Sequence, residues 1–222
     1  MIITNKSNIF YFFININIGM IKTDKDVWVT TEINDLWLFD KLILSRKLGH
    51  ICGPAGVPVP GPGNYIVRPI TNLEGMGIGA SICHIQNTTY HLSAGYFWCE
   101  IFEGRHISVD YNYGKPILSV EGFRNQDDPL YRFSKWLKVD QLYHVPLEVS
   151  VLRKFEYSNI EFIGNKIIEV HLRGNPDFVY NNTIAIPVWE DTVIEETENF
   201  RFVSSPDYKR KGFLIDIINE RL

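Results

Sequence analysis

The sequence predicts an α+β fold in which short antiparallel strands outnumber the helices. Short β-branched and aromatic runs alternate with glycine, proline and asparagine turns, which is the pattern of hairpins. A segment after Asp40 has the capping residue and the apolar spacing of a helix. With 45% hydrophobic residues, the 222-residue chain can bury the core of one large domain or two small lobes.

The composition restricts the classes of function. A net charge of −4 and a pI of about 5.9 argue against a dedicated nucleic-acid-binding protein. The unclustered cysteines argue against a disulfide framework or a zinc ribbon, and favour free thiols in the reducing cytoplasm; they are Cys52, Cys83 and Cys99. The apolar run Ile9–Ile18 is too short to cross a membrane and alternates like a strand. Residues 1–19 are expected to be an optional extension or a product of the chosen start codon, because Met20 opens a more ordinary sequence.

The next segment is expected to hold a strand, a helix and a turn-rich connector. Asp26–Glu32 reads as a short strand, and Asp40 caps a helix that Gly49 ends. The helical residues expected to face inward are Leu42, Ile43, Leu44 and Leu48. Cys52–Gly63 contains four prolines and four glycines, which excludes a helix or a central strand. An ordered loop is preferred to a linker there, because the flanking elements need each other for burial.

A glycine-rich loop between two strands follows. Tyr65–Pro69 is β-branched and ends in Arg-Pro, and Ala80–Ile82 begins the return strand. The glycines between them are Gly75, Gly77 and Gly79. Glycine lets backbone N–H groups converge on phosphate oxygens, and Arg68 adds a forked cation. The same spacing also occurs in ordinary tight turns, so phosphate binding stays open on this pattern alone.

The following segments are expected to form a meander and two helical pieces. Tyr96–Phe102 reads as a strand covered on both faces, although Glu100 interrupts it. His106–Tyr111 and Pro116–Val120 are expected to pair as antiparallel strands. The remaining expectations are a short helix at Leu130–Leu137 and either a helix or a strand at Pro146–Phe155.

A second hairpin carries the acidic residues. Asn159–Ile163 and Lys166–Leu172 are strands joined at Gly164-Asn165, and residues i and i+2 of a strand point to one face. Depending on register, one face therefore holds Glu161, Glu169 and His171. Such a set suits Mg²⁺ or Mn²⁺ bridging to phosphates, but two solvated outward glutamates explain the pattern equally well. After Phe178 the sequence is mixed and polar, with small apolar patches that pack back on the core; these are Pro187–Trp189 and Phe213–Ile218.

The order of these motifs resembles the ATP-grasp superfamily of carboxylate–amine ligases. The resemblance covers about Leu38–Phe178, and the order and spacing of the motifs carry it. The motifs are Asp40-Lys41-Leu42, Ala55–Pro60, Ile66–Pro69, the loop Asn72–Ala80, Trp98–Asp110, Asn159–Ile163 and Ile168–Arg173. The resemblance implies an ATP-grasp fold of two small lobes, each with an antiparallel sheet and helices, and a nucleotide cleft between them.

The resemblance also implies ATP as cofactor and a set of nucleotide-binding residues. These are Lys41, Arg68, Gly75, Gly77, Gly79, Glu100, Ile101, Phe102 and His106. Lys41 and Arg68 would neutralise the α- and β-phosphates, and the glycines would close over the γ-phosphate. Backbone atoms of Glu100–Phe102 would bind adenine. His106 stands where the family commonly has a ribose-binding glutamate, and a solvated strand histidine is the equally simple alternative.

The metal and catalytic residues follow from the same resemblance. Glu161 and Glu169 would carry Mg²⁺, while His171 replaces the usual asparagine and would favour Mn²⁺ or a one-metal site. Arg173, with Arg68, would be catalytic by holding the reacting carboxylate or its acyl phosphate. Asn159 stands where many relatives have an arginine, so Arg173 would act alone.

The sequence therefore predicts an ATP- and Mg²⁺-dependent ligase that joins a small-molecule or peptide carboxylate to an amine through an acyl phosphate. The expected divisions are an extension with a remnant strand at 1–37, the core at 38–178, and a C-terminal extension at 179–222. The chain is too short for the family's full N-terminal lobe, so the C-terminal segment, a partner protein or a second copy would supply the acceptor surface. The alternatives are a reduced domain that binds nucleotide or only a partner, and a metal-dependent phosphotransferase. No nucleic acid or membrane partner is expected.

Overall fold

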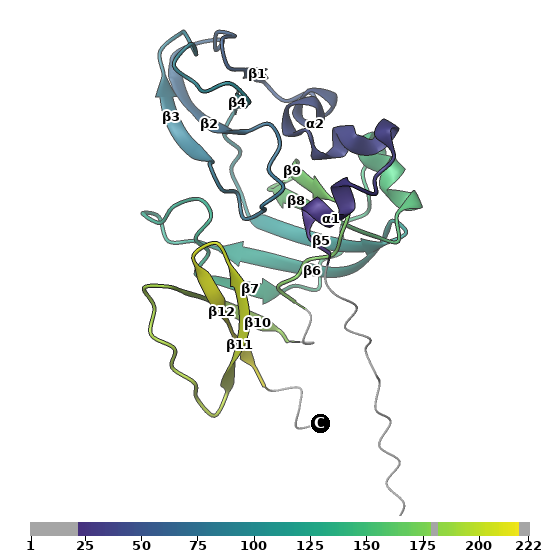
Figure 1. Cartoon of the computed structure of the whole chain (residues 1–222), viewed down its shortest axis with the longest axis vertical. Coiled ribbons are helices and arrows are strands. Elements are labelled where there is room, and N and C mark those ends of the chain that lie inside the picture. The colour runs from purple at the N-terminus through teal and green to yellow at the C-terminus, as the bar shows by residue number, and fades with distance from the viewer. Residues whose placement is uncertain (1–21, 179–181, 218–222) are drawn as a thin grey trace, which may run out of the picture.

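The computed structural model describes residues 22–178 and 182–217, which form two antiparallel sheets with few helices (Figure 1). The expected strand at Ile9–Ile18 lies outside these residues. The helices are α1 (Asp24–Trp28), a 3₁₀ helix at Ile33–Phe39, α2 (Lys41–Lys47) and a 3₁₀ helix at Leu147–Lys154. The strands are β1 (Cys52–Pro54), β2 (Gly63–Pro69), β3 (Ser81–Ile85), β4 (Tyr96–Cys99), β5 (His106–Asn112), β6 (Lys115–Phe123), β7 (Lys135–Lys138), β8 (Tyr157–Ile163), β9 (Lys166–His171), β10 (Ile184–Trp189), β11 (Phe200–Asp207) and β12 (Arg210–Asp216). The predicted α+β class is confirmed.

The smaller sheet has the strand order β1-β4-β2-β3. β2 and β3 pair antiparallel with Ile66 opposite Ile82, so the predicted hairpin around the glycine loop is confirmed. β4 is a buried central strand, as its apolar sequence predicted, but it ends at Cys99. The proline-rich connector contributes only β1, three residues at the sheet edge, where the sheet tolerates proline.

The larger sheet has the order β11-β12-β10-β7-β6-β5-β8-β9. Its centre is the predicted meander of β5 and β6, and the predicted hairpin of β8 and β9 continues it. β10–β12 extend the other side, since Ile184 and Ala185 of β10 pair with Leu137 and Trp136 of β7. The sequence indicated only apolar patches there, whereas the structure contains three further strands of one sheet.

Helix α2 connects the two sheets through neighbouring residues. Asp40 caps it as predicted, because its side chain accepts a hydrogen bond of 2.7 Å from the Ile43 amide. Leu42 packs with buried residues of the smaller sheet, and Leu44 belongs to the core under the larger sheet. Ile43 points outward and is 40% exposed, so the expectation that it faces inward is wrong.

The prediction of a strand at Asp26–Glu32 is wrong. Thr23 and Asp26 form a reciprocal capping box, which starts the short helix α1 at Asp24. The alternating Val27 and Val29 suggested a strand, but only Val27 is buried in the core. The remnant strand expected within 1–37 is therefore not present in its described part.

The prediction of a helix at Leu130–Leu137 is also wrong. Residues 130–134 form turns and an irregular segment, and β7 follows at Lys135. Trp136 of β7 lies opposite Gly122 of β6, where the missing side chain leaves room for the indole ring. The segment that fitted either a helix or a strand is a 3₁₀ helix, in which Val149 and Leu152 are buried.

Two further observations concern the described residues as a whole. The three cysteines are free thiols. No described helix has the length and hydropathy needed to span a membrane.

Candidate functional site

A cleft of about 650 Å³ lies between the two sheets. The glycine loop and β2 line it from the smaller sheet, and β5, β8 and β9 line it from the larger one. The cleft brings together these sequence-predicted residues: Lys41, Arg68, Gly75, Gly77, Glu100, Ile101, Phe102, His106, Glu161, Glu169, His171 and Arg173. Gly79 lies outside the cleft; a Cβ there would be 2.9 Å from the Tyr96 hydroxyl, so close packing explains this glycine.

Arg68 is a buried cation of the cleft that has no acidic partner among the described residues. Its side chain extends from β2, and the residue is only 8% exposed. The guanidinium carbon lies 5.2 Å from the centre of the Phe97 ring, while Nε makes no hydrogen bond. Among the described residues, no carboxylate pairs with it, although every buried charge normally has a partner. The geometry suits an anion that enters the cleft.

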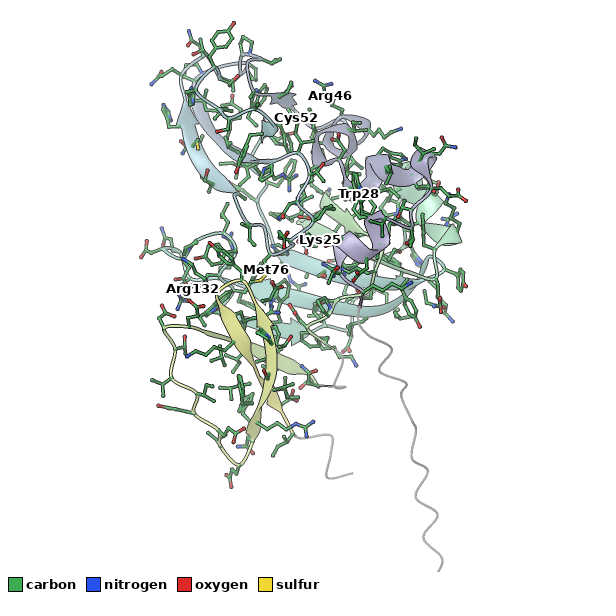
Figure 2. The ribbon with its side chains drawn as sticks, viewed as in Figure 1. Lys25, Trp28, Arg46, Cys52, Met76 and Arg132 are labelled. Carbon is green, nitrogen blue, oxygen red and sulfur yellow. The ribbon has the colours of Figure 1, made fainter. Side chains whose placement is uncertain are left out.

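The glycine loop has a backbone that ordinary residues rarely adopt. Gly75, Met76 and Gly77 all have positive φ angles, of 74°, 54° and 62°. Asn72 closes the first turn by donating a hydrogen bond of 2.8 Å to the Gly75 carbonyl. The exposed ion pair between Glu74 and Lys25 joins the loop to α1, and Figure 2 shows Lys25 and Met76 near one another.

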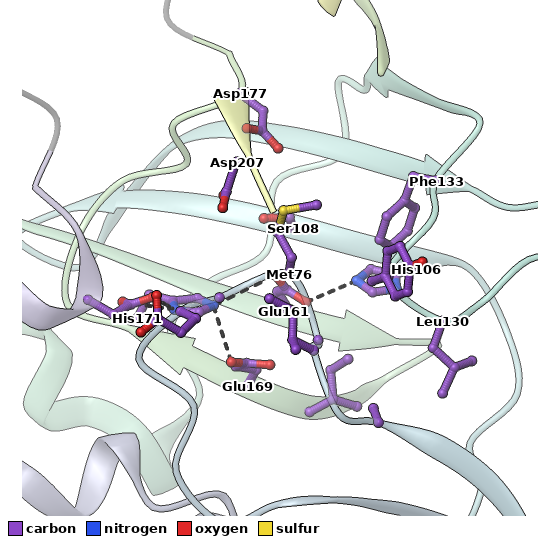
Figure 3. A pocket seen from close by; sticks show the side chains of 18 of the residues that line it. Met76, His106, Ser108, Leu130, Phe133, Glu161, Glu169, His171, Asp177 and Asp207 are labelled. Atoms are coloured by element: carbon purple, nitrogen blue, oxygen red, sulfur yellow. Dashed lines mark hydrogen bonds and ion pairs between the residues drawn. The ribbon is translucent and has the colours of Figure 1, made fainter. Parts of the chain in front are cut away.

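The two glutamates of the second hairpin face each other across the strands. Glu161 of β8 is the register partner of Glu169 of β9. Lys41 Nζ lies 2.6 Å from Glu169 Oε1. His106 Nε2 lies 3.1 Å from Glu161 Oε2 (Figure 3). The alternative of two solvated glutamates is therefore wrong, and so is that of a solvated His106, whose side chain is 16% exposed. Burial alone would raise the pKa of Glu161, but hydrogen bonds from His106 and His171 hold it well below its usual range.

Asp24 binds the two cationic side chains at the end of β9. Both of its carboxylate oxygens lie 3.1 Å from His171 Nδ1, and Oδ2 accepts a hydrogen bond of 2.8 Å from Arg173. Burial would raise the pKa of Asp24, but His171 and Arg173 lower it to about 2. Burial would lower the pKa of His171, but Asp24 and Glu161 raise it to about 9. No sequence signal marked Asp24, because its partners lie almost 150 residues further along the chain.

The acidic residues are engaged by protein cations rather than arranged as a three-ligand cage. Among the described residues, no group of three or more His, Cys, Asp or Glu side chains has the geometry of a metal site. His171 Nε2 lies 3.6 Å from Glu169 Oε1 and 3.7 Å from Glu161 Oε1. The donor set still fits Mg²⁺, which proteins usually bind through one or two carboxylates together with substrate phosphates. His171 has only Nε2 available for such a role, since Nδ1 is bonded to Asp24.

The segment after β4 forms one wall of the cleft. The Glu100 carboxylate accepts a hydrogen bond of 2.8 Å from the Ile51 amide, and the Glu100 amide donates to the Ile51 carbonyl. Phe102 packs edge-on against His50 with ring centres 4.6 Å apart. The side chain of Glu100 is thus engaged with the backbone, while Ile101 remains 40% exposed.

A buried hydrogen-bond network holds the turn that follows Arg173. Asn159 donates a hydrogen bond of 2.7 Å to Asp110, and Asp110 also accepts a hydrogen bond of 2.9 Å from the Asn175 amide. Burial raises the pKa of Asp110 to about 6, against the lowering effect of these hydrogen bonds. Asn159 is therefore linked through Asp110 to the turn that follows Arg173, and no sequence signal marked Asp110.

The far end of the cleft is made by the C-terminal hairpin. Arg210 of β12 pairs with Asp177 at 3.2 Å and lies 3.9 Å from Asp207. Burial raises the pKa of Asp177, although the charge of Arg210 opposes this. Figure 3 shows Asp177 and Asp207 on the side of the cleft away from Glu169. The sequence did not mark this charged cluster either.

Comparisons with known proteins give matches only among solved structures. No protein-family model and no curated protein sequence matches the chain. The structure of N5-carboxyaminoimidazole synthetase from Staphylococcus aureus complexed with ADP matches with a TM-score of 0.50 and 12% identity, over 83% of this chain and 68% of that one. An ATP-grasp superfamily protein from Archaeoglobus fulgidus matches with a TM-score of 0.47 and 18% identity, over 81% of this chain. This chain spans 64% of the length of that second structure.

Proposed function

Because the chain has the ATP-grasp fold, we propose that its cleft binds ATP and that the protein ligates a carboxylate to an amine through an acyl phosphate. The predicted nucleotide residues line the cleft, with the exception of Gly79. The solved structure with the same fold from Staphylococcus aureus is complexed with ADP, which supports a nucleotide as the ligand. The reaction, the substrates and the assembly are parts of this proposal.

The unpaired guanidinium of Arg68 carries the proposal. A buried charge without a partner costs several kcal/mol, so it persists where a ligand repays that cost. Arg68 lies in the same cleft as the glycine loop, in which Gly75, Met76 and Gly77 have positive φ angles. A triphosphate would supply the anionic oxygens that both features need.

Magnesium is proposed to bind at Glu161 and Glu169. These carboxylates come from facing positions of two strands and line the cleft. When bound, the ion would neutralise the charge that develops on the transferred phosphoryl group. His171 Nε2 is the third proposed ligand, and manganese is the alternative ion because imidazole is a softer donor than an amide oxygen.

The remaining residues would act by binding and positioning. Lys41 would stabilise the α- and β-phosphates with the N–H groups that Glu169 does not use, since an ammonium has three donors. The backbone at Ile101 and Phe102 would bind adenine. His106 is proposed near the ribose, although its Nε2 already bonds Glu161, so its first effect is to orient that carboxylate. Arg173 would hold the carboxylate substrate in line with the γ-phosphate.

The acceptor side is proposed at the far end of the cleft. This end of the cleft is lined by Asp177, Asp207 and Arg210. The C-terminal segment would thereby supply the acceptor-binding surface that was expected of it from the sequence. A small amine or a peptide amine is the proposed occupant. A partner protein or a second copy of the chain is the alternative source of this surface.

Thermal unfolding with and without MgATP tests the proposal. A ligand that binds only the folded state raises the melting temperature, and concentrations of 100 times Kd stabilise by about 2.7 kcal/mol. Release of ADP and phosphate that requires both the carboxylate pool and the amine pool, together with an amide product, would support ligation. Glu169→Gln should abolish this turnover and leave the fold intact, whereas AMP release or no melting shift would contradict the proposal.

A nucleotide-binding or structural module without ligase activity is the second candidate. The observation that favours it is the pairing of Glu161 and Glu169 with His106 and Lys41, which leaves the described residues without a three-ligand metal group. This candidate predicts either no melting shift at all or a shift with MgATP and no ADP release.

A further inference from the structure

Asp24 lies where the N-terminal helix meets the cleft. The residue belongs to α1, is 3% exposed, and lines the cleft together with His171 and Arg173. Of its two partners, His171 is the last residue of β9 and Arg173 lies two residues beyond the strand. One carboxylate thus bridges an imidazole and a guanidinium that both belong to the proposed site.

The contact with Asp24 determines which nitrogen of His171 faces the glutamates. An ionised carboxylate only accepts hydrogen bonds, so Nδ1 must carry the proton that lies between the two groups. Nε2 is then the nitrogen directed toward Glu161 and Glu169. A carboxylate that bonds one ring nitrogen of a histidine fixes the orientation of the ring in this way.

The same carboxylate fixes the plane of the Arg173 guanidinium. Nη2 donates to Asp24 at 2.8 Å and Nη1 donates to the Gly174 carbonyl at 3.1 Å. Two hydrogen bonds to separate acceptors define the orientation of a rigid fork. The glycine loop lies directly beside it, since a Cβ built on Gly75 would be 3.8 Å from Nη2.

We propose that Asp24 is a positioning residue of the site, which acts by holding His171 and Arg173 in the orientations that the ligation needs. This inference rests on the proposed function, because it concerns the same cleft. Loss of Asp24 would leave two cationic side chains without their shared acceptor, so each would adopt several orientations. The N-terminal helix is then a part of the site rather than an extension of the core.

The neighbouring Asp26 provides the matched control. It belongs to the same short helix and caps it, but it is exposed and contacts neither His171 nor Arg173. Asp26→Ala removes the carboxylate half of the capping box, while the Thr23 side chain can still accept from the backbone N–H of residue 26, and both site contacts of Asp24 stay in place. Asp24→Ala removes both contacts, and Asp24→Asn keeps the shape and an oxygen that can meet both donors but removes the negative charge.

The test is nuclear magnetic resonance of the full, ligand-free chain, observing the ring N–H of His171 and the guanidinium N–H groups of Arg173. Hydrogen-bonded protons exchange slowly with water, so the wild type and Asp26→Ala should show both signals. Asp24→Ala should lose both signals, and in Asp24→Asn both should exchange faster than in the wild type, because a neutral acceptor holds the two cations more weakly. Unchanged signals in folded Asp24→Ala, or unchanged exchange in Asp24→Asn, would overturn the inference.

MgATP titration of the same samples separates this inference from the proposed function. The affinity of Asp24→Ala for MgATP should be lower than that of Asp26→Ala, because the change releases His171, which is proposed to hold the magnesium ion. A wild type that binds no MgATP would contradict the proposed function, while the N–H signals would still decide the role of Asp24.

Discussion

Lys41 Nζ lies 2.6 Å from Glu169 Oε1, and the two side chains are only 6% and 11% exposed. This buried ion pair joins α2 to the acidic hairpin. Lys41→Met leaves the carboxylate without its partner and should lower the free energy of unfolding by about 3–5 kcal/mol. Urea denaturation of Lys41→Met, Glu169→Gln and the double variant measures the coupling.

The double variant should be less destabilised than the sum of the single variants, since no unpaired charge remains. Arg105 offers the comparison, because it pairs with Glu121 at 2.6 Å but its side chain is 50% exposed. Arg105→Met should cost much less stability than either single change in the buried pair, because solvent screens its charge. Strict additivity at Lys41 and Glu169 would show that the two charges do not interact.

Arg68 should have opposite effects on stability and on binding. Arg68→Met removes a buried charge without a described partner, so the ligand-free protein should be as stable as the wild type or more stable. Its affinity for MgATP should fall by about 10- to 100-fold, the effect of losing hydrogen bonds to a charged group. Calorimetric titration and urea denaturation measure the two quantities.

Arg68→Lys is the matched variant, because it keeps the charge and loses the fork. It should retain more affinity than Arg68→Met. Equal affinity for MgATP in all three proteins would indicate that the β2–β3 hairpin is only a turn.

Two glycines of the loop should respond differently to alanine. Gly77 has a φ of 62° and open space around its Cβ position, so Gly77→Ala should cost about 1 kcal/mol through the backbone alone. Gly79→Ala adds contacts of 2.9 Å to the Tyr96 hydroxyl and 3.0 Å to Pro69, and should be destabilised further. Thermal denaturation compares them, and a larger loss in Gly77→Ala would contradict the packing described for Gly79.

The ion pair between His171 and Asp24 makes stability depend on pH. Folding raises the pKa of His171 from 6.5 to about 9, so this contribution is fully present below pH 6.5 and is lost as the pH rises to 9. The loss should amount to about 3 kcal/mol in the metal-free protein, since one pKa unit corresponds to 1.36 kcal/mol. Asp24 stays ionised across this window because its pKa is about 2.

Urea denaturation at pH 6.5 and pH 9 measures this loss. His171→Gln removes the titrating group and should show a flatter dependence over the same interval. A wild-type protein whose free energy of unfolding rises between the two pH values would contradict the assigned ion pair.

Local sequence patterns predicted the elements whose structure depends on local chemistry. The β2–β3 and β8–β9 hairpins follow from turn residues and alternation, and Asp40 marked the start of α2. The errors at α1 and β7 arose where a pattern was shared by two structures. Val27 and Val29 alternate as in a strand, but the capping box that Thr23 forms with Asp26 stabilises a helix instead.

The sequence predicted the site residues that lie on one hairpin and missed the contacts between segments that are distant in the sequence. The register that places Glu161 opposite Glu169 follows from one hairpin turn, so sequence sufficed. The contacts of Asp24 with His171 and of Asp110 with Asn175 join distant segments, and such pairs leave no periodic trace in one sequence. The division of the chain near residue 178 stays a prediction.

The pairing of β10 with β7 has a consequence for the edges of the larger sheet. β10–β12 cover the side of β7 that would otherwise present unpaired N–H and C=O groups, and Phe213 and Ile215 bury Trp136. A chain cut after residue 178 would expose that side of β7 together with the Trp136 indole. Unprotected strand edges recruit other strands, so the shortened chain would self-associate rather than fold as a smaller domain.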